Sequence, residues 1–273
     1  MARSAILNVM VAAAEKAGRN LARDFGEVEN LQVSKKGPAD FVSRADKRAE
    51  EICLAELSRA RPDYGFLGEE GTNLAPRDGQ HVFIVDPLDG TTNFLHGLPM
   101  FAVSIGLRRG DDVIAGVIFN PVTDELYSAE RGRGAFLNNR RLRVAGRQDL
   151  SSALLSTGVP FLGHGNQPRF FTEMQPLMGK IAGLRRNGSA ALELAWVAAG
   201  RIDGFWEHDL NAWDMAAGIA LVREAGGFVT DTSGGDRMLD TGTVVAGNEY
   251  MQRAMLKNIV AAKAARRERA ADE

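Results

Sequence analysis

The sequence predicts an α+β fold, and two observations support this prediction. Between residues 101 and 144, short segments rich in Val, Ile, Phe and Tyr alternate with turn residues, which is typical of an antiparallel meander. Before and after this region, apolar residues recur at helical spacing, most clearly over residues 4–25. We therefore expect a large sheet with helices packed against it.

Length and composition indicate one large domain or two closely packed halves. The chain has 273 residues, of which 45% are hydrophobic and 25% are charged, as in ordinary globular proteins. The formal net charge of −2 gives no overall footprint for a nucleic acid or a membrane. We treat 1–273 as a single domain with two subdomains, of about 1–148 and 149–273.

Several classes of protein are excluded by the composition. The single cysteine, Cys53, leaves no internal disulfide and no cysteine-rich zinc site. No apolar run reaches the roughly 20 residues that a membrane-spanning helix needs. The first residues also lack the basic segment and apolar core of a secretory signal. We expect a cytoplasmic protein that does not interact with a membrane.

In chain order, the first part alternates between helices and short extended segments. A helix is expected over 4–25, a weak strand over 31–36, a second helix over about 45–59 and a short strand over 64–67. Asp46 falls in the first turn of the second helix, where the helix dipole favours a carboxylate. Glu69 and Glu70 follow between two glycines and, taken alone, resemble an exposed acidic turn.

The segment 82–94 is the most informative part of the sequence. Four apolar residues, 82–85, run directly into Asp86, as in a strand buried on both faces. Pro87 cannot donate a hydrogen bond, so strand pairing should stop there. Asp89 then falls in a turn that Gly90 lets bend tightly, and a short helix should begin near this glycine.

Two carboxylates at the end of a buried strand are costly unless a cation lies between them. Oxygen ligands of this kind suit Mg²⁺ or Mn²⁺ better than zinc. The free N–H groups at the start of the following helix suit a phosphate. The alternative for Asp86-Pro87 and for Asp89-Gly90, each taken alone, is an ordinary turn.

The meander should continue into a last hairpin over 134–144, and the remaining elements alternate again. The expected elements are strands over 153–156, 183–186, 202–206, 228–231 and 243–246, a loop over 161–169, and helices over 170–179, 189–199, 214–225 and from 248 onward.

Three segments of the second half place polar residues at the ends of these elements. Residues 185–190 read Arg-Arg-Asn-Gly-Ser-Ala; the Gly-Ser pair can cap a helix, and the arginines can bind phosphate or remain a solvated pair. Glu207 ends a strand and is followed by His208, which is most simply a surface residue. Asp214 opens a helix of small residues and, alone, would be a carboxylate favoured by the helix dipole.

At this point the chain resembles a known family. Asp86-Pro-Leu-Asp89-Gly-Thr91 and Trp213-Asp214-Met-Ala-Ala-Gly218 are similar to the two signatures of the inositol monophosphatase family, and the resemblance extends from about residue 35 to about residue 248. It implies a layered α/β/α/β/α sandwich, a homodimer, and a Mg²⁺-dependent, lithium-sensitive phosphatase. Two or three Mg²⁺ ions are implied, with Mn²⁺ as a substitute.

The resemblance also implies roles for individual residues. The metal ligands would be Glu69, Asp86, the carbonyl of Leu88, Asp89 and Asp214. The catalytic group would be Thr91, oriented by Asp46 and assisted by Glu69 in taking a proton from the attacking water. The substrate would contact Asp89, Gly90, Thr91, Arg185, Gly188, Ser189, Ala190, Glu207 and Asp214. The chain departs from the family at His208, where a glycine is usual.

The expected reaction is hydrolysis of a phosphate monoester on a small alcohol or sugar, with inositol 1-phosphate as the first candidate. Relatives act on fructose 1,6-bisphosphate, histidinol phosphate, NADP or 3′-phosphonucleotides, and residues around the metals bind what these substrates share. Two alternatives belong to other classes. One is an association with RNA or RNA polymerase through Arg185-Arg186 and the basic stretch 131–147; the other is an inert Mg²⁺- or Ca²⁺-binding scaffold, which the full set of matched ligands disfavours.

Overall fold

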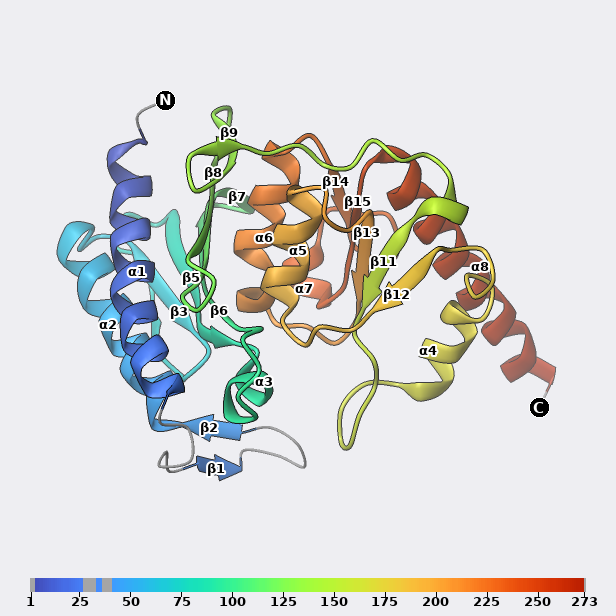
Figure 1. Cartoon of the computed structure of the whole chain (residues 1–273), viewed down its shortest axis with the longest axis horizontal. Helices are drawn as coiled ribbons and strands as arrows, with labels where there is room; N and C mark the ends of the chain where they lie inside the picture. The colour runs from blue at the N-terminus through green and yellow to red at the C-terminus, as the bar shows by residue number, and fades with distance from the viewer. Residues whose placement is uncertain (1–2, 27–32, 36–40, 273) are drawn as a thin grey trace.

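The computed structural model describes residues 3–26, 33–35 and 41–272, and it contains five alternating layers of helix and sheet. In Figure 1, helices α1 and α2 form one outer layer, followed by a first sheet, then α5 and α6, then a second sheet, and finally α4 and α8. This order confirms the expected α/β/α/β/α sandwich. Residues 31, 32 and 36 of the expected strand over 31–36 lie outside the described residues.

The outer helices form where the apolar spacing predicts them. Helix α1 spans Ala5–Phe25 and begins at Ser4, whose hydroxyl accepts the N–H of Leu7 at 3.1 Å. Helix α2 spans Arg44–Ala60 and packs with α1 against the first sheet. A separate strand pair, β1 (Val33–Lys35) and β2 (Phe41–Ser43), lies between the two helices in the chain.

The first sheet contains the predicted meander. Its strand order is β10-β9-β8-β7-β6-β5-β3-β4, and all neighbours are antiparallel except β3 and β5. The strands are β3 (Gly65–Gly68), β4 (Asn73–Leu74), β5 (His81–Asp89), β6 (Ala102–Arg109), β7 (Asp112–Asn120), β8 (Glu125–Glu130), β9 (Gly134–Leu137) and β10 (Arg140–Arg141). The short helix α3 spans Thr91–Leu95.

The last hairpin of this sheet turns earlier than the sequence pattern predicts. Asn138 and Asn139 both adopt positive φ angles, of 44° and 69°, and form the two-residue turn between β9 and β10. The return strand is therefore Arg140–Arg141 and not 142–144.

The second sheet mixes parallel and antiparallel pairs in the order β12-β11-β13-β15-β14. Its strands are β11 (Leu154–Thr157), β12 (Gly183–Arg185), β13 (Gly204–Glu207), β14 (Phe228–Thr230) and β15 (Val244–Gly247). The helices of this half are α4 (Gln167–Met174), α5 (Ala190–Ala198), α6 (Ala212–Glu224), α7 (Met238–Thr241) and α8 (Glu249–Asp272). The sequence pattern does not predict the short α7 and β4.

Helix α4 begins earlier than the sequence pattern predicts. Asn166 and Pro168 are typical loop residues, but Asn166 is the N-cap and accepts the N–H of Arg169 at 2.8 Å. Pro168 occupies the first turn, where its missing N–H costs nothing. The helix is therefore Gln167–Met174 instead of 170–179.

Small residues let α6 approach the first sheet very closely. A Cβ atom added at Gly106 would lie 2.6 Å from the Cβ of Ala216, and one added at Gly116 would lie 2.3 Å from the carbonyl oxygen of Ala217. On the other side of α6, a Cβ at Gly218 would lie 2.4 Å from the side chain of Leu194 in α5. The small residues Ala216, Ala217 and Gly218 after Asp214 therefore allow this helix to pack closely against β6 and β7.

The chain leaves the first sheet at Arg141 and enters the second at Leu154. One hydrophobic cluster contains buried residues of both halves, among them Ile84, Ile118, Phe205 and Ala246. We propose on this basis that the halves 1–148 and 149–273 form a single domain.

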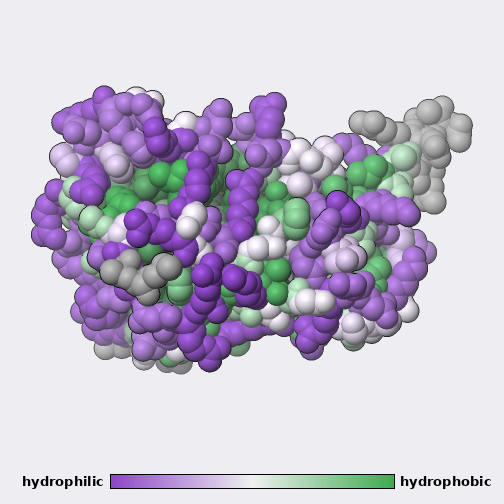
Figure 2. All heavy atoms as spheres, turned by 90° about the horizontal axis from the view of Figure 1, so that it is seen from above, coloured by the Kyte–Doolittle hydropathy of each residue, from purple (hydrophilic) through white to green (hydrophobic). Residues whose placement is uncertain are grey.

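The surface agrees with this packing. On the face in Figure 2, hydrophilic side chains form most of the surface and hydrophobic ones show between them in patches. Within the described part of the chain, no helix is both long enough and apolar enough to cross a lipid bilayer.

Candidate active site

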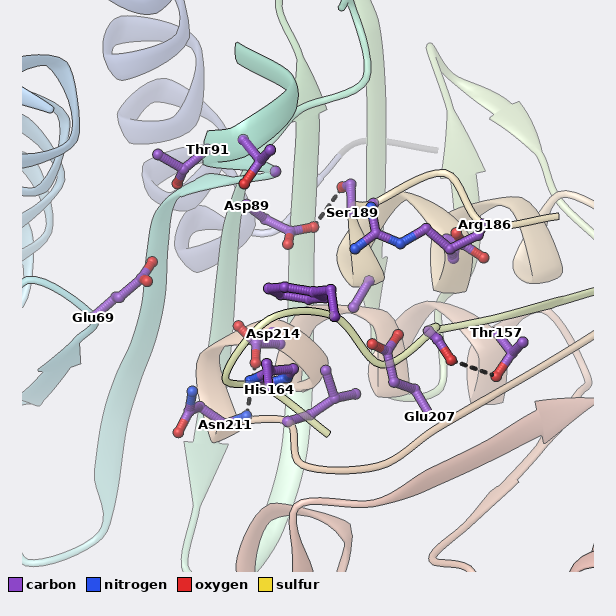
Figure 3. A pocket seen from close by; sticks show the side chains of 18 of the residues that line it. Glu69, Asp89, Thr91, Thr157, His164, Arg186, Ser189, Glu207, Asn211 and Asp214 are labelled. Atoms are coloured by element: carbon purple, nitrogen blue, oxygen red, sulfur yellow. Dashed lines mark hydrogen bonds between the residues drawn. The ribbon is translucent and has the colours of Figure 1, made fainter. Parts of the chain in front are cut away.

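A cavity of about 340 Å³ lies where the two sheets and the two middle helices meet. Its walls come from segments that are far apart in the sequence, and Figure 3 shows their side chains directed into one space. Predicted site residues that line it are Glu69, Asp89, Gly90, Thr91, Gly188, Ser189, Ala190, Glu207 and Asp214.

Asp86 and Asp89 reach the site because β5 is bulged between them. Asp86 pairs with Ser104 and Asp89 with Ala102, and the register shifts between the two pairs. The expectation that pairing ends at Pro87 is therefore wrong: the bulge removes the proline from the ladder, and pairing resumes beyond it. The carboxylate of Asp86 accepts the N–H of Leu88 at 2.9 Å, which fixes the turn of the bulge.

Asp89 is held by the second half of the chain. One oxygen of its carboxylate accepts the hydroxyl of Ser189 and the backbone N–H of Ala191, the latter at 2.8 Å. Ser189 is also the N-cap of α5 and accepts the N–H of Leu192. The carboxylate therefore lies at the positive end of a helix dipole, where a negative charge is favoured.

Asp214 is held by the start of α6. It occupies the third position of the helix and accepts the N–H of Asn211 at 2.7 Å in a capping box. The close packing of Ala216 and Ala217 on Gly106 and Gly116 brings this first turn up to the sheet.

Asp86, Asp89 and Asp214 form a compact acidic cluster. Each offers a carboxylate oxygen, and these oxygens lie within 4.8 Å of one another. Burial, followed by the negative charges of Glu69, Asp89 and Asp214, raises the pKa of Asp86 well above its usual range. Burial and the charge of Asp89 likewise raise the pKa of Asp214. Three oxygen ligands that repel one another, two of them buried and that of Asp214 half-buried, fit a hard divalent cation.

Two opposing influences act on the pKa of Asp89. Burial raises its pKa to about 6, but the hydrogen bonds from Ser189 and Ala191 act in the opposite direction and stabilise the charged form. The bonds from the start of α5 therefore offset part of the cost of burying a charge at Asp89.

Two of the three predicted catalytic residues, Glu69 and Thr91, line the cavity beside this cluster. Glu69 lines the cavity and is half-buried after β3, where its N–H donates to the carbonyl of Val85; it is not an exposed acidic turn. The hydroxyl of Thr91 donates to the carbonyl of Leu88 at 3.0 Å. Asp46 is buried in the first turn of α2 and is not among the residues lining the cavity.

The opposite wall of the cavity agrees with the predicted substrate side, apart from one arginine. Arg186 lines the cavity, whereas Arg185 is exposed on β12 and donates to the carbonyl of Leu184 at 2.9 Å. The structure thus places the second arginine of the pair at the site instead of the first, because the chain leaves β12 between them. Glu207 lies so close to Gly158 that a Cβ at that glycine would fall 1.8 Å from the carboxylate.

Two acidic residues near the cavity are not identified by the sequence pattern. Glu193 is buried in α5, lines the cavity and accepts the N–H of Asn187 at 2.7 Å; burial raises its pKa to about 8. The indication in the sequence is a single glutamate inside the apolar run of α5. The carboxylate of Glu173 lies 2.9 Å from Nε2 of His208. The side chain of His208 is only 14% exposed, so the expectation that His208 is a surface residue is wrong.

A comparison with protein families matches residues 2–267 to the inositol monophosphatase family. The chain is 63% identical over 259 residues to an inositol-1-monophosphatase of Mesorhizobium japonicum, covering 95% of this chain and 97% of that protein. It is 43% identical over 258 residues to the Nus factor SuhB of Pseudomonas aeruginosa, covering 93% and 95%.

Solved structures give the same result. The extragenic suppressor protein suhB from Bartonella henselae superposes with a TM-score of 0.91 at 56% identity, over 94% of this chain and 98% of that chain. An inositol monophosphatase from Anabaena gives a TM-score of 0.80 at 35% identity, over 93% and 94%. The chain therefore belongs to the inositol monophosphatase family, whose members are metal-dependent phosphatases that act on small phosphorylated substrates.

Proposed function

We propose that this protein hydrolyses inositol 1-phosphate to inositol and phosphate in a Mg²⁺-dependent reaction. The observation that carries the proposal is the cluster of Asp86, Asp89 and Asp214, of which Asp89 and Asp214 line a cavity of about 340 Å³. Relatives at 62–63% identity bear the name inositol-1-monophosphatase, which supports the same substrate.

The cation ligands that we propose are Glu69, Asp86, Asp89, Asp214 and the carbonyl of Leu88, with two or three Mg²⁺ ions bound and Mn²⁺ as a substitute. When bound, divalent cations would neutralise the phosphate and stabilise the attacking and leaving oxygens. Without them, the burial and mutual repulsion of the carboxylates favour proton uptake by Asp86 and Asp214, as their raised pKa values indicate.

Thr91 and Glu69 are the groups that we propose to handle the proton of the attacking water. Because the hydroxyl of Thr91 donates its own proton to the carbonyl of Leu88, its oxygen is left as an acceptor for the water. The carboxylate of Glu69 faces the same cavity and would accept the proton. Asp46, buried in the first turn of α2, would orient Thr91.

The phosphate itself would bind at the start of α3. Gly90 is the N-cap of this helix, with a φ of 95°, and the first N–H groups of a helix lack partners within it. These groups at Gly90 and Thr91 line the cavity and suit a phosphate oxygen.

The alcohol portion would lie against the wall formed by Gly188, Ser189, Ala190 and Glu207. Glu193 adds a second buried carboxylate to this wall, and Arg186 adds a cation. Carboxyl groups exchange hydrogen bonds with hydroxyls, so this wall suits an alcohol with several hydroxyl groups, such as a cyclitol or a sugar. Phe161 and His164 line the same cavity, so phosphate-release measurements, and not this wall, distinguish such a substrate from NADP or a 3′-phosphonucleotide.

Phosphate release from a panel of monoesters tests the proposal. The panel contains inositol 1-phosphate, fructose 1,6-bisphosphate, histidinol phosphate, NADP and a 3′-phosphonucleotide, each with Mg²⁺, with EDTA, and with Li⁺ added. We expect the highest kcat/KM for inositol 1-phosphate, loss of activity with EDTA and inhibition by Li⁺. Asp86→Asn is expected to lower turnover by orders of magnitude in a folded protein, and near-normal turnover of this variant would contradict the site assignment.

A second candidate function is an association with the transcription machinery. It is favoured by the Nus factor name of relatives that are 42–43% identical to this chain. The exposed Arg185 is available for such a contact, but Arg131 and Arg147 of the basic stretch already pair with Asp112 and Asp203. Salt-sensitive retention of RNA polymerase or RNA that persists in Asp86→Asn and is lost in Arg185→Ala would support this role.

Sedimentation of the purified protein tests the homodimer that the family resemblance implies.

A further inference from the structure

A second cavity, also of about 340 Å³, lies away from the acidic cluster. It is bounded by the β6–β7 hairpin, the C-terminal part of α6 and the α7 segment. No residue lines both cavities. Helix α6 connects them, because Asp214 in its first turn faces the first cavity and Arg223 near its end faces the second, roughly 13 Å further along the helix axis.

The charged side chains around this second cavity are unequally paired. Arg223 forms an ion pair with Asp236, and Arg237 lies 3.1 Å from Asp240. The side chain of Arg108, which is half-buried at the end of β6, forms neither an ion pair nor a hydrogen bond with any described residue, and its Nε atom is fully buried. The cavity therefore contains a partly desolvated guanidinium whose acceptor is not supplied by the described part of the chain.

The rest of the wall is apolar on one side and acidic at the rim. Val113, Ile219 and Met238 are buried side chains that face the cavity. Asp111 is exposed on the β6–β7 turn, and no ion pair with a described residue neutralises it. A ligand that satisfies Arg108 must therefore carry an acceptor and an apolar part, and a multiply charged anion would be repelled by Asp111, Asp236 and Asp240.

We propose that this cavity is a binding site for a small organic acid with one carboxylate and an apolar body. The carboxylate would accept two hydrogen bonds from the guanidinium of Arg108, a geometry that suits this pair of groups. The apolar body would leave water where it lies against the buried side chains of Val113, Ile219 and Met238. The site is independent of the phosphatase site, so the proposal does not depend on the substrate assigned above.

The test uses 3-phenylpropanoate and its neutral amide, 3-phenylpropanamide, as probes on the full-length protein. Ligand-detected NMR titrations measure both affinities. We expect saturable binding of the acid and at least roughly tenfold weaker binding of the amide, because a charge-assisted hydrogen bond is lost. Arg108→Gln should weaken binding of the acid by a similar factor, so that the acid and the amide bind with equal affinity.

The matched control is Arg109→Gln. Arg109 is the next residue of β6, but it is exposed and its Nε donates to Gln80, so its loss should leave the acid affinity within about twofold. Leu239→Trp provides a second variant, which fills the cavity while keeping Arg108 and should block the acid without reducing phosphate release.

Three results would overturn the proposal. They are equal affinity for the acid and the amide, unchanged acid binding in both Arg108→Gln and Leu239→Trp, and no saturable binding of either probe. Thermal unfolding of each variant shows whether it is folded. If Arg108→Gln is not folded, acid binding by Leu239→Trp decides whether the acid occupies this cavity.

Discussion

Replacing Gly116 by alanine tests whether close packing of α6 positions the acidic cluster. The added Cβ would lie 2.3 Å from the carbonyl oxygen of Ala217 and 2.8 Å from its Cα, and both are backbone atoms that cannot rotate away. Restoring a contact of about 3.0 Å requires α6 and β7 to separate by roughly 0.7 Å, which is an overpacking cost of about 1–3 kcal/mol.

The same displacement should reach the site, because Asp214 is one turn before Ala217 on the same rigid helix. A shift approaching 1 Å in a catalytic constellation can lower turnover by about 100-fold, so we expect kcat/KM for phosphate release to fall by roughly 10- to 100-fold. The apparent Mg²⁺ affinity should weaken, and Tm should drop by about 2–4 °C for each kcal/mol lost.

Phosphate release and thermal unfolding are measured side by side on Gly116→Ala and on the control Gly146→Ala. A Cβ added at Gly146 would have no neighbouring heavy atom within 4 Å, so this replacement should leave both quantities close to those of the unaltered protein. If Gly116→Ala behaves like the control, the idea that small residues in this helix set the position of Asp214 is refuted.

Three further predictions concern the charged residues of the site. In the absence of metal, Asp214→Asn should unfold at a temperature equal to or higher than that of the unaltered protein, because repulsion between the carboxylates is relieved. Adding Mg²⁺ should raise the Tm of the unaltered protein but not that of the variant, and a rise in the variant would count against Asp214 as a ligand. Burial raises the pKa of Glu193 from 4.5 to about 8, so the folded state holds a proton that the unfolded state releases, and stability should fall as pH rises through that interval. Denaturant titrations of the metal-free protein should show a flatter pH dependence for Glu193→Gln, and an unchanged slope would disprove this. Arg186→Ala should raise KM by roughly tenfold while Arg185→Ala leaves it nearly unchanged, and the reverse order in steady-state kinetics would refute the placement of the pair.

The sequence predicts best what is decided locally. The meander follows from alternating β-rich and turn residues, and α1 from apolar spacing behind a serine cap. Asp86 and Asp89 stand out as two carboxylates three apart at the end of an apolar strand, whereas Asp214 is added to them only by the resemblance to the family. Each of these patterns needs only a few neighbouring residues to be recognised.

What could not be predicted depends on contacts between distant segments. The bulge that returns β5 to its ladder beyond Pro87 is defined by pairing with β6. Arg186 and not Arg185 reaches the cavity because β12 ends between them, which a doublet of arginines does not reveal. The sequence does not identify Glu193 as a site residue, because a glutamate in a helix is ordinarily exposed. Its role depends on the position of α5 beside the cavity.

The bonds that Asp89 receives from Ser189 and Ala191 have a consequence for dividing this protein. A fragment ending near residue 148 would still contain Asp86 and Asp89, but it would lack the hydroxyl and the amide that orient the second of them. The complementary fragment would carry Asp214 on α6 without the first sheet, on which Ala216 and Ala217 pack at Gly106 and Gly116. Each fragment would therefore lack part of the acidic cluster, so the proposed reaction would require both halves, and changes in one half during evolution must be compatible with the other.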